Sequence, residues 1–447
     1  MYTTPQLHDA SMYQTAGVSL AAMVFAFVLV SYLGKRLKQE IPLAVNLFVC
    51  IIAGTLVSGF GIPLRHLLEG PVWYIYVNLV ILTGMIFLVC LKEAGNLDSI
   101  AHDIITKFRN RPVILFCLIT LMLFFPGMVT GIGTAGVLST GLVAVVLLRA
   151  VGVPDVQSAA IVAMLTSIGA AAPPINIPAV IIASGINMPY EGFDLILAVI
   201  TFPLGLFTIF WLGYRHYKSP TLEEIERALP RPTRKGALAP YVPLLVVVAI
   251  FVLIRALPGK VPDIATPMVF MIGSLCTLFT GKKFSYVEAS RQAVRGGIFS
   301  TVALIFVVGA VVQVTTLTGA KGLLVLGALT MAAASPVLLY VALGISLPLL
   351  GGVLTHLGAA VILGIPFTLS MLTQNVIVVV AGISMLCVLS QVVPPSALGG
   401  YFAQELVGEK RYGPILRACA VPTAVCIAFS TFVLVFADRF AKLFVAF

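Results

Sequence analysis

Apolar segments long enough to cross a lipid bilayer recur along almost the whole chain. A membrane-crossing helix needs about 20 mostly apolar residues, because the hydrocarbon core is about 30 Å thick. That core holds no water to pair backbone amides and carbonyls, so each segment must form its hydrogen bonds internally, as a helix does. The expected spans are 16–34, 42–60, 72–92, 158–184, 189–214, 238–257, 264–281, 298–318, 374–398 and 413–437.

The composition excludes a soluble globule. Of the 447 residues, 60% are hydrophobic and 10% are charged, whereas soluble domains carry roughly 25% charged residues. The net charge of +10 is concentrated in a few loops, and no basic helix with interleaved aromatic residues is present. We therefore predict an all-α polytopic protein whose partner is the lipid bilayer, with no nucleic-acid partner. The first apolar segment lacks a positively charged leader, so we expect it to be retained as a span.

Two further apolar blocks, 112–148 and 335–370, are longer than one span. Small and polar residues interrupt each block near its centre, as PGMVTGIGTAG at 126–136 and LLGGVLTHLGA at 349–359. Irregular backbone at membrane depth is tolerated only where it is buried in protein or lines a cavity. We therefore interpret both blocks as re-entrant hairpins, each made of two helices that meet at a tip inside the membrane.

Two proline pairs interrupt two other spans, in GAAAPPINIPA at 169–179 and SQVVPPSALGG at 390–400. A proline inside a helix removes a hydrogen bond and clashes with the preceding turn, at a cost of about 3 kcal/mol. Both spans are therefore predicted to be broken helices. The two proline pairs are 221 residues apart, and so are Thr134 and Thr355 in the centres of the two hairpins.

The distribution of basic residues predicts the orientation. If the amino terminus is outside and both hairpins return to their own side, twenty Lys and Arg residues lie inside and six outside, as the positive-inside rule requires. The second half then begins inside, which makes the halves an inverted repeat. We expect about 5+5 transmembrane helices, two re-entrant hairpins and two broken helices, an arrangement typical of secondary transporters.

Motifs of enzymes and nucleotide-driven pumps are absent from the sequence, which has no phosphate-binding loop, HExxH, GxSxG or CxxC. We expect no enzyme activity and no cofactor, and an ion gradient as the energy source. Proton-coupled carriers usually place carboxylates or histidines within the membrane, but neither proline break has a carboxylate near its centre. A sodium site needs only oxygen ligands, so sodium is the predicted coupling ion.

Oxygen-bearing residues cluster at the hairpin centres and the breaks, including Ser167 and Ser390. Carbonyls at the carboxyl ends of half-helices attract cations, and amides at the amino ends attract anions. His356 is open to two interpretations: it binds a substrate carboxylate or senses pH, or it is a neutral histidine bonded to a carbonyl. The candidate substrate-binding residues are Asn176, Ser396, His356, Pro174 and Pro395.

The segments LFFPGMVTGIGTAGVLSTG (123–141) and AAIVAMLTSIGAAAPPINIPAVIIASGINMPYEGF (159–193) resemble the large membrane subunit of the tripartite ATP-independent periplasmic (TRAP) transporters, within the wider ion transporter superfamily. The resemblance recurs at LSQVVPPSALGGYFA (389–403). It implies a sodium-driven elevator in the bacterial inner membrane that imports an organic anion of the carboxylate or dicarboxylate class. It also implies two partners, a periplasmic substrate-binding protein and a small four-span membrane subunit.

The resemblance further implies two sodium sites and a division into a scaffold and a transport domain. The sites are Thr130, Gly131, Thr134, Gly169 and Pro173, and then Gly351, Gly352, Thr355, Gln391 and Pro394. The segments are 1–95 (scaffold, first half), 96–111 (interfacial arm helix), 112–215 (transport domain, first half), 216–237 (cytoplasmic linker), 238–334 (scaffold, second half with arm) and 335–447 (transport domain, second half).

This sequence departs from the family pattern at both the first tip and the first break. Gly131 is followed by Ile132 and Gly133 where the family often carries Gly-Ser, and the first break reads Pro-Pro-Ile-Asn in place of Pro-Pro-Ser. Two alternatives remain open at this stage: a carboxylate symporter that needs no binding protein, and an ion-conducting channel or pump subunit.

Overall fold

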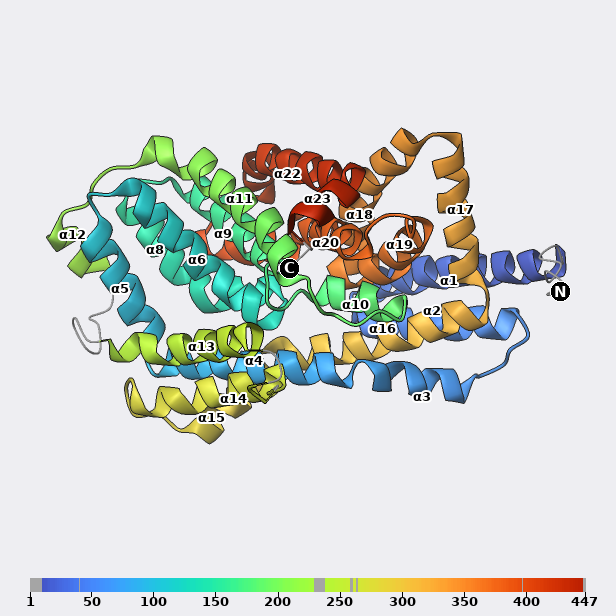
Figure 1. The fold of residues 1–447 in the computed structure, drawn as a ribbon, viewed down its shortest axis with the longest axis horizontal. Helices are drawn as coiled ribbons and strands as arrows, with labels where there is room; N and C mark the ends of the chain where they lie inside the picture. Colours follow the sequence, from blue (N-terminus) through green and yellow to red (C-terminus); the bar gives the residue numbers. More distant parts are fainter. Residues whose placement is uncertain are drawn as a thin grey trace.

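The computed structural model describes residues 10–39, 41–228, 238–257, 260–262, 264–395 and 397–444, and every regular element in these ranges is helical (Figure 1). Eight helices in the described part of the chain are long and apolar enough to cross a membrane, and further apolar helices are shorter. The predicted class, an all-α polytopic membrane protein, is confirmed.

The two halves of the chain contain similar series of helices, connected by a short helical segment. The first half comprises α1 (Ala10–Leu37), α2 (Leu43–Val57), α3 (Leu64–Trp73), α4 (Ile75–Glu93), α5 (Asn96–Phe108), α6 (Pro112–Thr130), α7 (Gly133–Gly136), η1 (Val137–Gly141), α8 (Leu142–Ala150), α9 (Asp155–Gly169), α10 (Ile177–Gly185) and α11 (Asp194–Gly213). The connecting segment holds η2 (Tyr214–His216) and α12 (Leu222–Ala228). The second half comprises η3 (Ala239–Tyr241), α13 (Val242–Ala256), α14 (Thr266–Cys276), η4 (Thr277–Phe279), α15 (Tyr286–Ala293), η5 (Val294–Ile298), α16 (Phe299–Leu317), α17 (Ala320–Ala334), α18 (Pro336–Ala359), η6 (Ala360–Gly364), α19 (Ile365–Ser370), α20 (Val376–Val388), η7 (Leu389–Val392), α21 (Leu398–Val407), α22 (Tyr412–Val435) and α23 (Ala437–Phe444).

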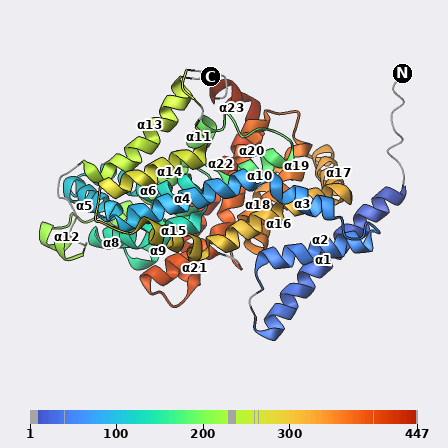
Figure 2. The ribbon, with the colours of Figure 1, turned by 90° about the horizontal axis from the view of Figure 1, so that it is seen from below.

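Two long helical elements run side by side across the molecule (Figure 2). One is α3 with α4, and the other is α15, η5 and α16. They cross where Gly70 meets Gly309, and a Cβ atom on either glycine would overlap the backbone of the other. The sequence predicted spans only over 72–92 and 298–318, because the charged residues of α3 and α15 end the apolar pattern although the helices continue.

Both predicted hairpins are present. In the first, α6 ends at Gly131, whose φ of +66° is the left-handed conformation that glycine adopts most easily, and the chain returns through α7, η1 and α8. In the second, α18 is interrupted at Thr355, with φ 63° and ψ 166°, and the chain returns through η6 and α19. Figure 1 shows the bases of the two hairpins at opposite ends of the molecule, so that their tips meet near its centre.

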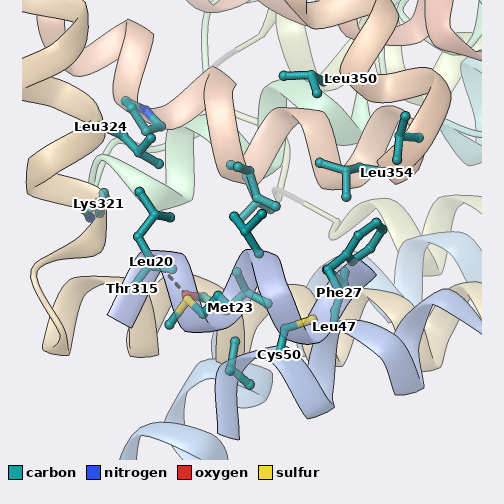
Figure 3. Close-up of a pocket in the computed structure, with 17 residues that line it drawn as sticks. Leu20, Met23, Phe27, Leu47, Cys50, Thr315, Lys321, Leu324, Leu350 and Leu354 are labelled. Carbon is teal, nitrogen blue, oxygen red and sulfur yellow. Dashed lines mark hydrogen bonds between the residues drawn. The ribbon is translucent and has the colours of Figure 1, made fainter. Parts of the chain in front are cut away.

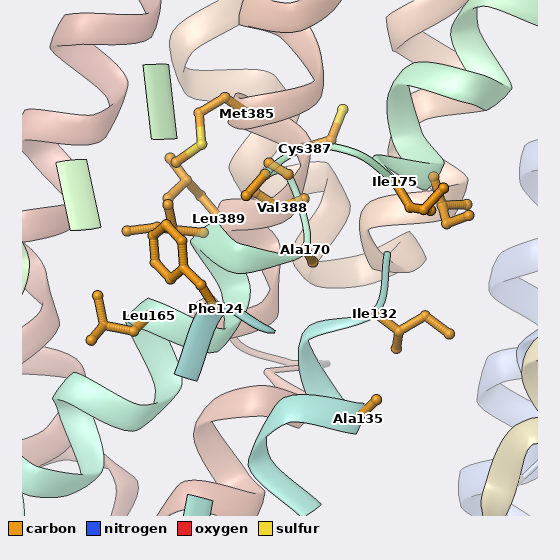
Figure 4. Close-up of a cluster of buried hydrophobic side chains, with 14 of the residues drawn as sticks. Phe124, Ile132, Ala135, Leu165, Ala170, Ile175, Met385, Cys387, Val388 and Leu389 are labelled. Atoms are coloured by element: carbon orange, nitrogen blue, oxygen red, sulfur yellow. The ribbon is translucent and has the colours of Figure 1, made fainter. Parts of the chain in front are cut away.

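Both predicted breaks are also present, at residues 170–176 between α9 and α10 and at 393–397 between α20 and α21. The peptide bonds within both proline pairs, Pro173–Pro174 and Pro394–Pro395, are cis. The second half-helix of the second break extends to Val407, beyond the predicted limit of 398. The two breaks lie beside a shared apolar core (Figure 4).

Two helices, α5 and α17, run across the direction of most other helices, at opposite ends of the molecule (Figure 1). The first, α5, lies in the predicted interfacial arm 96–111, and the second, α17, lies in the predicted scaffold segment 238–334 that was expected to contain the second arm. The connecting segment folds onto the base of the first hairpin, where Ser219 Oγ donates to Asn110 Oδ1 at 2.8 Å and Lys218 N donates to Val151 O at 2.8 Å. The remainder of the predicted linker, 229–237, lies outside the described residues.

Candidate functional site

The tip of the first hairpin packs directly on the first break. A Cβ atom at Gly127 would lie 2.5 Å from the carbonyl carbon of Gly169 and 2.6 Å from Ala170 N, so the two backbones touch. A Cβ atom at Gly131 would overlap the side chain of Ile177, the first residue of α10. Glycine therefore permits this close approach at both positions.

The hydroxyl of Thr130 closes this tip on itself. Its Oγ1 donates to Pro126 O at 2.7 Å and accepts from Ile132 N at 3.2 Å, and the residue is fully buried. These two bonds satisfy the hydroxyl without a ligand. Whether Thr130 also contacts an ion stays a prediction.

The second hairpin packs on the second break in the same way. A Cβ atom at Gly351 would lie 2.5 Å from the Cβ of Ser390, and one at Gly352 would lie 2.9 Å from Val393 O and 2.8 Å from Pro394 O. Two backbone carbonyls of the second break thus point at Gly352. Each hairpin therefore contacts the break of its own half, as the sequence predicted.

A small cavity of about 70 Å³ lies where the two tips and the second break meet α16. It is larger than the volume needed for one water. Thr134, from the first tip, faces the same cavity as Thr355 and Gln391, although the sequence grouped Thr134 with the first break. Gln391 also approaches the first tip, because a Cβ atom on Gly133 would overlap its side-chain oxygen. The full lining is Ile132, Thr134, Thr301, Leu304, Thr355, His356, Leu357, Ser390, Gln391 and Leu398.

Five buried polar atoms in the lining residues of this cavity have no hydrogen-bond partner among the described residues. Thr355 contributes its hydroxyl, His356 its Nε2, Ser390 its hydroxyl, and Gln391 both its amide oxygen and its amide nitrogen. An unsatisfied buried polar group costs about 1–3 kcal/mol. These atoms are concentrated around one small cavity and are available to an ion, a water or a substrate.

Asn176 has a structural role that needs no ligand. Its Oδ1 accepts from Ala179 N at 3.0 Å and caps α10, while its Nδ2 donates to Ala171 O at 3.0 Å and to Ser384 Oγ at 2.8 Å. The side chain is fully buried. It therefore joins the two sides of the first break and attaches them to α20. The predicted substrate contact of Asn176 is untested.

The prolines of the two breaks differ in exposure. Pro173, Pro174 and Pro394 are half-buried, whereas Pro395 is exposed. Pro174 O accepts from the hydroxyl of Tyr190 at 3.3 Å. Ser396, the remaining predicted substrate residue, lies outside the described residues.

None of the described residues that line the cavity is Asp, Glu, Lys or Arg. Its chemistry is that of hydroxyls, one amide, one imidazole and the nearby carbonyls of the second break. Such a set supplies oxygen ligands to a hard cation and donors to an anion. The described residues contain no group of three His, Cys, Asp or Glu side chains that could hold a metal ion.

Sequence reasoning missed the contribution of α16 to this site. Thr301 and Leu304 line the cavity, yet nothing in the local sequence of α16 separates these positions from the rest of an apolar helix. The inverted arrangement of hairpins shows which elements form the site, but it does not show which turn of a neighbouring span covers it.

This fold, in which each hairpin packs on a helix break and a small cavity lies where the two tips meet the second break, is that of a multi-pass membrane transporter. A family model described as the DctM component of the tripartite ATP-independent periplasmic transporter matches residues 116–441. The chain therefore belongs to this family of large TRAP permease subunits, as the sequence motifs indicated.

The fold also resembles a solved transporter. The structure of the YdaH transporter of Alcanivorax borkumensis superposes with a TM-score of 0.57 at 16% sequence identity, covering 95% of this chain and 98% of that one. At this identity the likeness concerns the fold alone. None of the curated proteins compared with the chain matches it.

Proposed function

We propose that this chain is the permease that carries an organic anion of the carboxylate class into the cell together with sodium. Family membership establishes a TRAP-type secondary transporter, and such permeases normally work with a binding protein and a small membrane subunit. The proposal that sodium and an organic anion are carried together rests on one observation. Buried polar atoms around the cavity between the two tips have no hydrogen-bond partner among the described residues.

Sodium is proposed at the second hairpin, beside Gly352 and Thr355. The carbonyl oxygens of Val393 and Pro394 lie close to Gly352, and the hydroxyl of Thr355 has no partner among the residues that the structure describes. Backbone carbonyls and hydroxyls are the ligands that unwound transporter helices offer to sodium. The substrate anion is proposed next to it, at His356 and Gln391, where the donors are neutral and the sodium ion would supply the positive charge.

Transport is proposed to follow an elevator movement along α16. Thr301 and Leu304, which line the cavity, lie two and five residues after the start of α16 at Phe299. If the amino terminus of the chain is outside, this end of α16 is cytoplasmic, and the structure represents an inward-facing state. Gln313 lies twelve residues further along and lines a second cavity at the other end, which is a distance of about 18 Å at 1.5 Å per residue.

The coupling is tested by uptake into proteoliposomes that contain the chain, its small subunit and its binding protein. The substrate is first identified by a thermal-stability screen of organic acids with and without sodium, because a ligand that binds only the folded protein raises its melting temperature. We expect an inward sodium gradient to drive accumulation. Equal uptake without sodium would overturn the coupling, and a conductance far above carrier turnover would indicate a channel.

The elevator movement is tested by disulfide cross-linking in a variant without the seven native cysteines. Leu398→Cys should cross-link to Thr301→Cys in the state described here, because both residues line the central cavity. It should cross-link to Gln313→Cys only in the opposite state. A cross-link to Thr301→Cys that forms fully under all conditions while uptake continues would contradict the movement.

A further inference from the structure

A larger apolar cavity, of about 330 Å³, separates the first two helices from the second hairpin (Figure 3). Met23 and Phe27 of α1 form part of one wall, and Leu350 and Leu354 of α18 form part of the opposite wall. Its lining is almost wholly apolar, and Lys321 is the one charged residue among the described residues that line it. Because Leu350 and Leu354 belong to α18, the cavity lies against the arm of the second hairpin that leads to the tip at Thr355.

Lys321 is the cationic residue of that lining and stands in the first turn of α17. Its ammonium group is half-buried and donates to Gly185 O, at the carboxyl end of α10, at 3.4 Å. An ammonium carries three donors, and no other acceptor is found for it among the described residues. The remaining donors are therefore available to an anionic group.

Lys321 also lines a second cavity, of about 190 Å³. Its walls are polar and include Ser184, Asn187, Gln313 and Thr316. Lys321 thus marks the boundary between a polar compartment and an apolar one. A molecule that fills both must have an anionic polar head and an apolar chain.

We propose that this composite site binds one anionic phospholipid, with its phosphate at Lys321 and an acyl chain in the apolar cavity. The apolar walls exclude a free carboxylate from the larger compartment, because burying an uncompensated charge is costly. A lysine close to a membrane surface attracts anionic head groups. The lipid would occupy the space between α1, α2 and the second hairpin, and so would contact the surface along which that hairpin must move.

The head-group contact is tested by native mass spectrometry of the purified full-length protein with phosphatidylglycerol and phosphatidylcholine of identical acyl chains. We expect retention of one phosphatidylglycerol in preference to phosphatidylcholine. The variant Lys321→Gln should reduce that preference about fivefold, since a lysine near a membrane surface contributes about 1 kcal/mol to anionic lipid binding. Lys260→Gln is the matched control, because Lys260 is exposed and lines neither cavity.

The acyl-chain contact is tested on α1. Val24 lines the apolar cavity and is 57% exposed, whereas Val28 on the same helix is 60% exposed and does not line it. Val24→Trp should displace the retained lipid, and Val28→Trp should not. Equal retention of both lipids by the unmodified protein would overturn the proposal, as would binding of glycerol phosphate that competes fully with phosphatidylglycerol. Because the readout is lipid retention, failure here leaves the proposed sodium coupling untouched.

Discussion

The first and second breaks are built from corresponding elements, but they differ in how their polar atoms are paired. At the first, Asn176 makes three hydrogen bonds and the hydroxyl of Thr130 makes two within the protein. At the second, the side chains of Ser390 and Gln391, and the hydroxyl of Thr355 at the facing tip, have no hydrogen-bond partner within the part of the chain that the structure describes. The polar side chains of the first break are paired within the protein, and we propose that a ligand pairs with those of the second.

The comparison teaches that a proline break does not by itself make a binding site. Residue 176 is an asparagine that caps the following half-helix, whereas the corresponding residue 397 is an alanine and caps nothing with its side chain. The side-chain cap that Asn176 gives to α10 therefore has no counterpart at the start of α21. We expect the two breaks to respond in opposite ways to removal of their polar side chains.

The largest loss of stability is expected for Asn176→Ala. It removes a helix cap and leaves the buried carbonyl of Ala171 unpaired, at a combined cost of about 3 kcal/mol. Unfolding of the purified protein by sodium dodecyl sulfate, followed by circular dichroism, measures this loss. Ser384→Ala, which removes one of the three bonds of Asn176, should cost about 1 kcal/mol. If Asn176→Ala unfolds like the unmodified protein but no longer responds to substrate, Asn176 is a substrate ligand, as the sequence suggested.

A smaller loss is expected for Gly352→Ala at the second tip. The new Cβ atom would stand 2.8 Å from Pro394 O and 2.9 Å from Val393 O, and such overpacking costs about 2 kcal/mol. It would also cover the two proposed sodium ligands, so stabilisation by sodium should disappear. Gly413→Ala is the control, since nothing lies within 4 Å of the added atom. A sodium response that survives Gly352→Ala would show that the ion binds elsewhere.

Much of this architecture follows from the sequence, because hydrophobic length and proline placement act locally. The limits of the hairpin blocks and of α5, and the positions of both breaks, were predicted to within a few residues. The pairing of polar atoms could not be predicted, since it depends on contacts across the chain. Asn176 meets Ser384 over a separation of 208 residues, and Gln391 approaches the tip of the other hairpin at Gly133. Neither contact leaves a trace in the local pattern.

The smallest effect on stability is expected for Gln391→Met. The amide of Gln391 is 3% exposed and both of its polar atoms lack a partner. Replacing it with an apolar side chain of similar length removes a desolvation cost and breaks no bond, so stability should change by less than about 1 kcal/mol or increase. Substrate-dependent stabilisation should fall at the same time, because the donor and acceptor proposed for the anion are gone. The two measurements together distinguish the roles of the two breaks. Asn176→Ala should lower stability and keep the ligand response in the remaining folded protein. Gln391→Met should leave stability nearly unchanged or raise it, and should weaken the ligand response. A loss of stability for Gln391→Met as large as that for Asn176→Ala would mean that the second break, too, is held together by its own side chains.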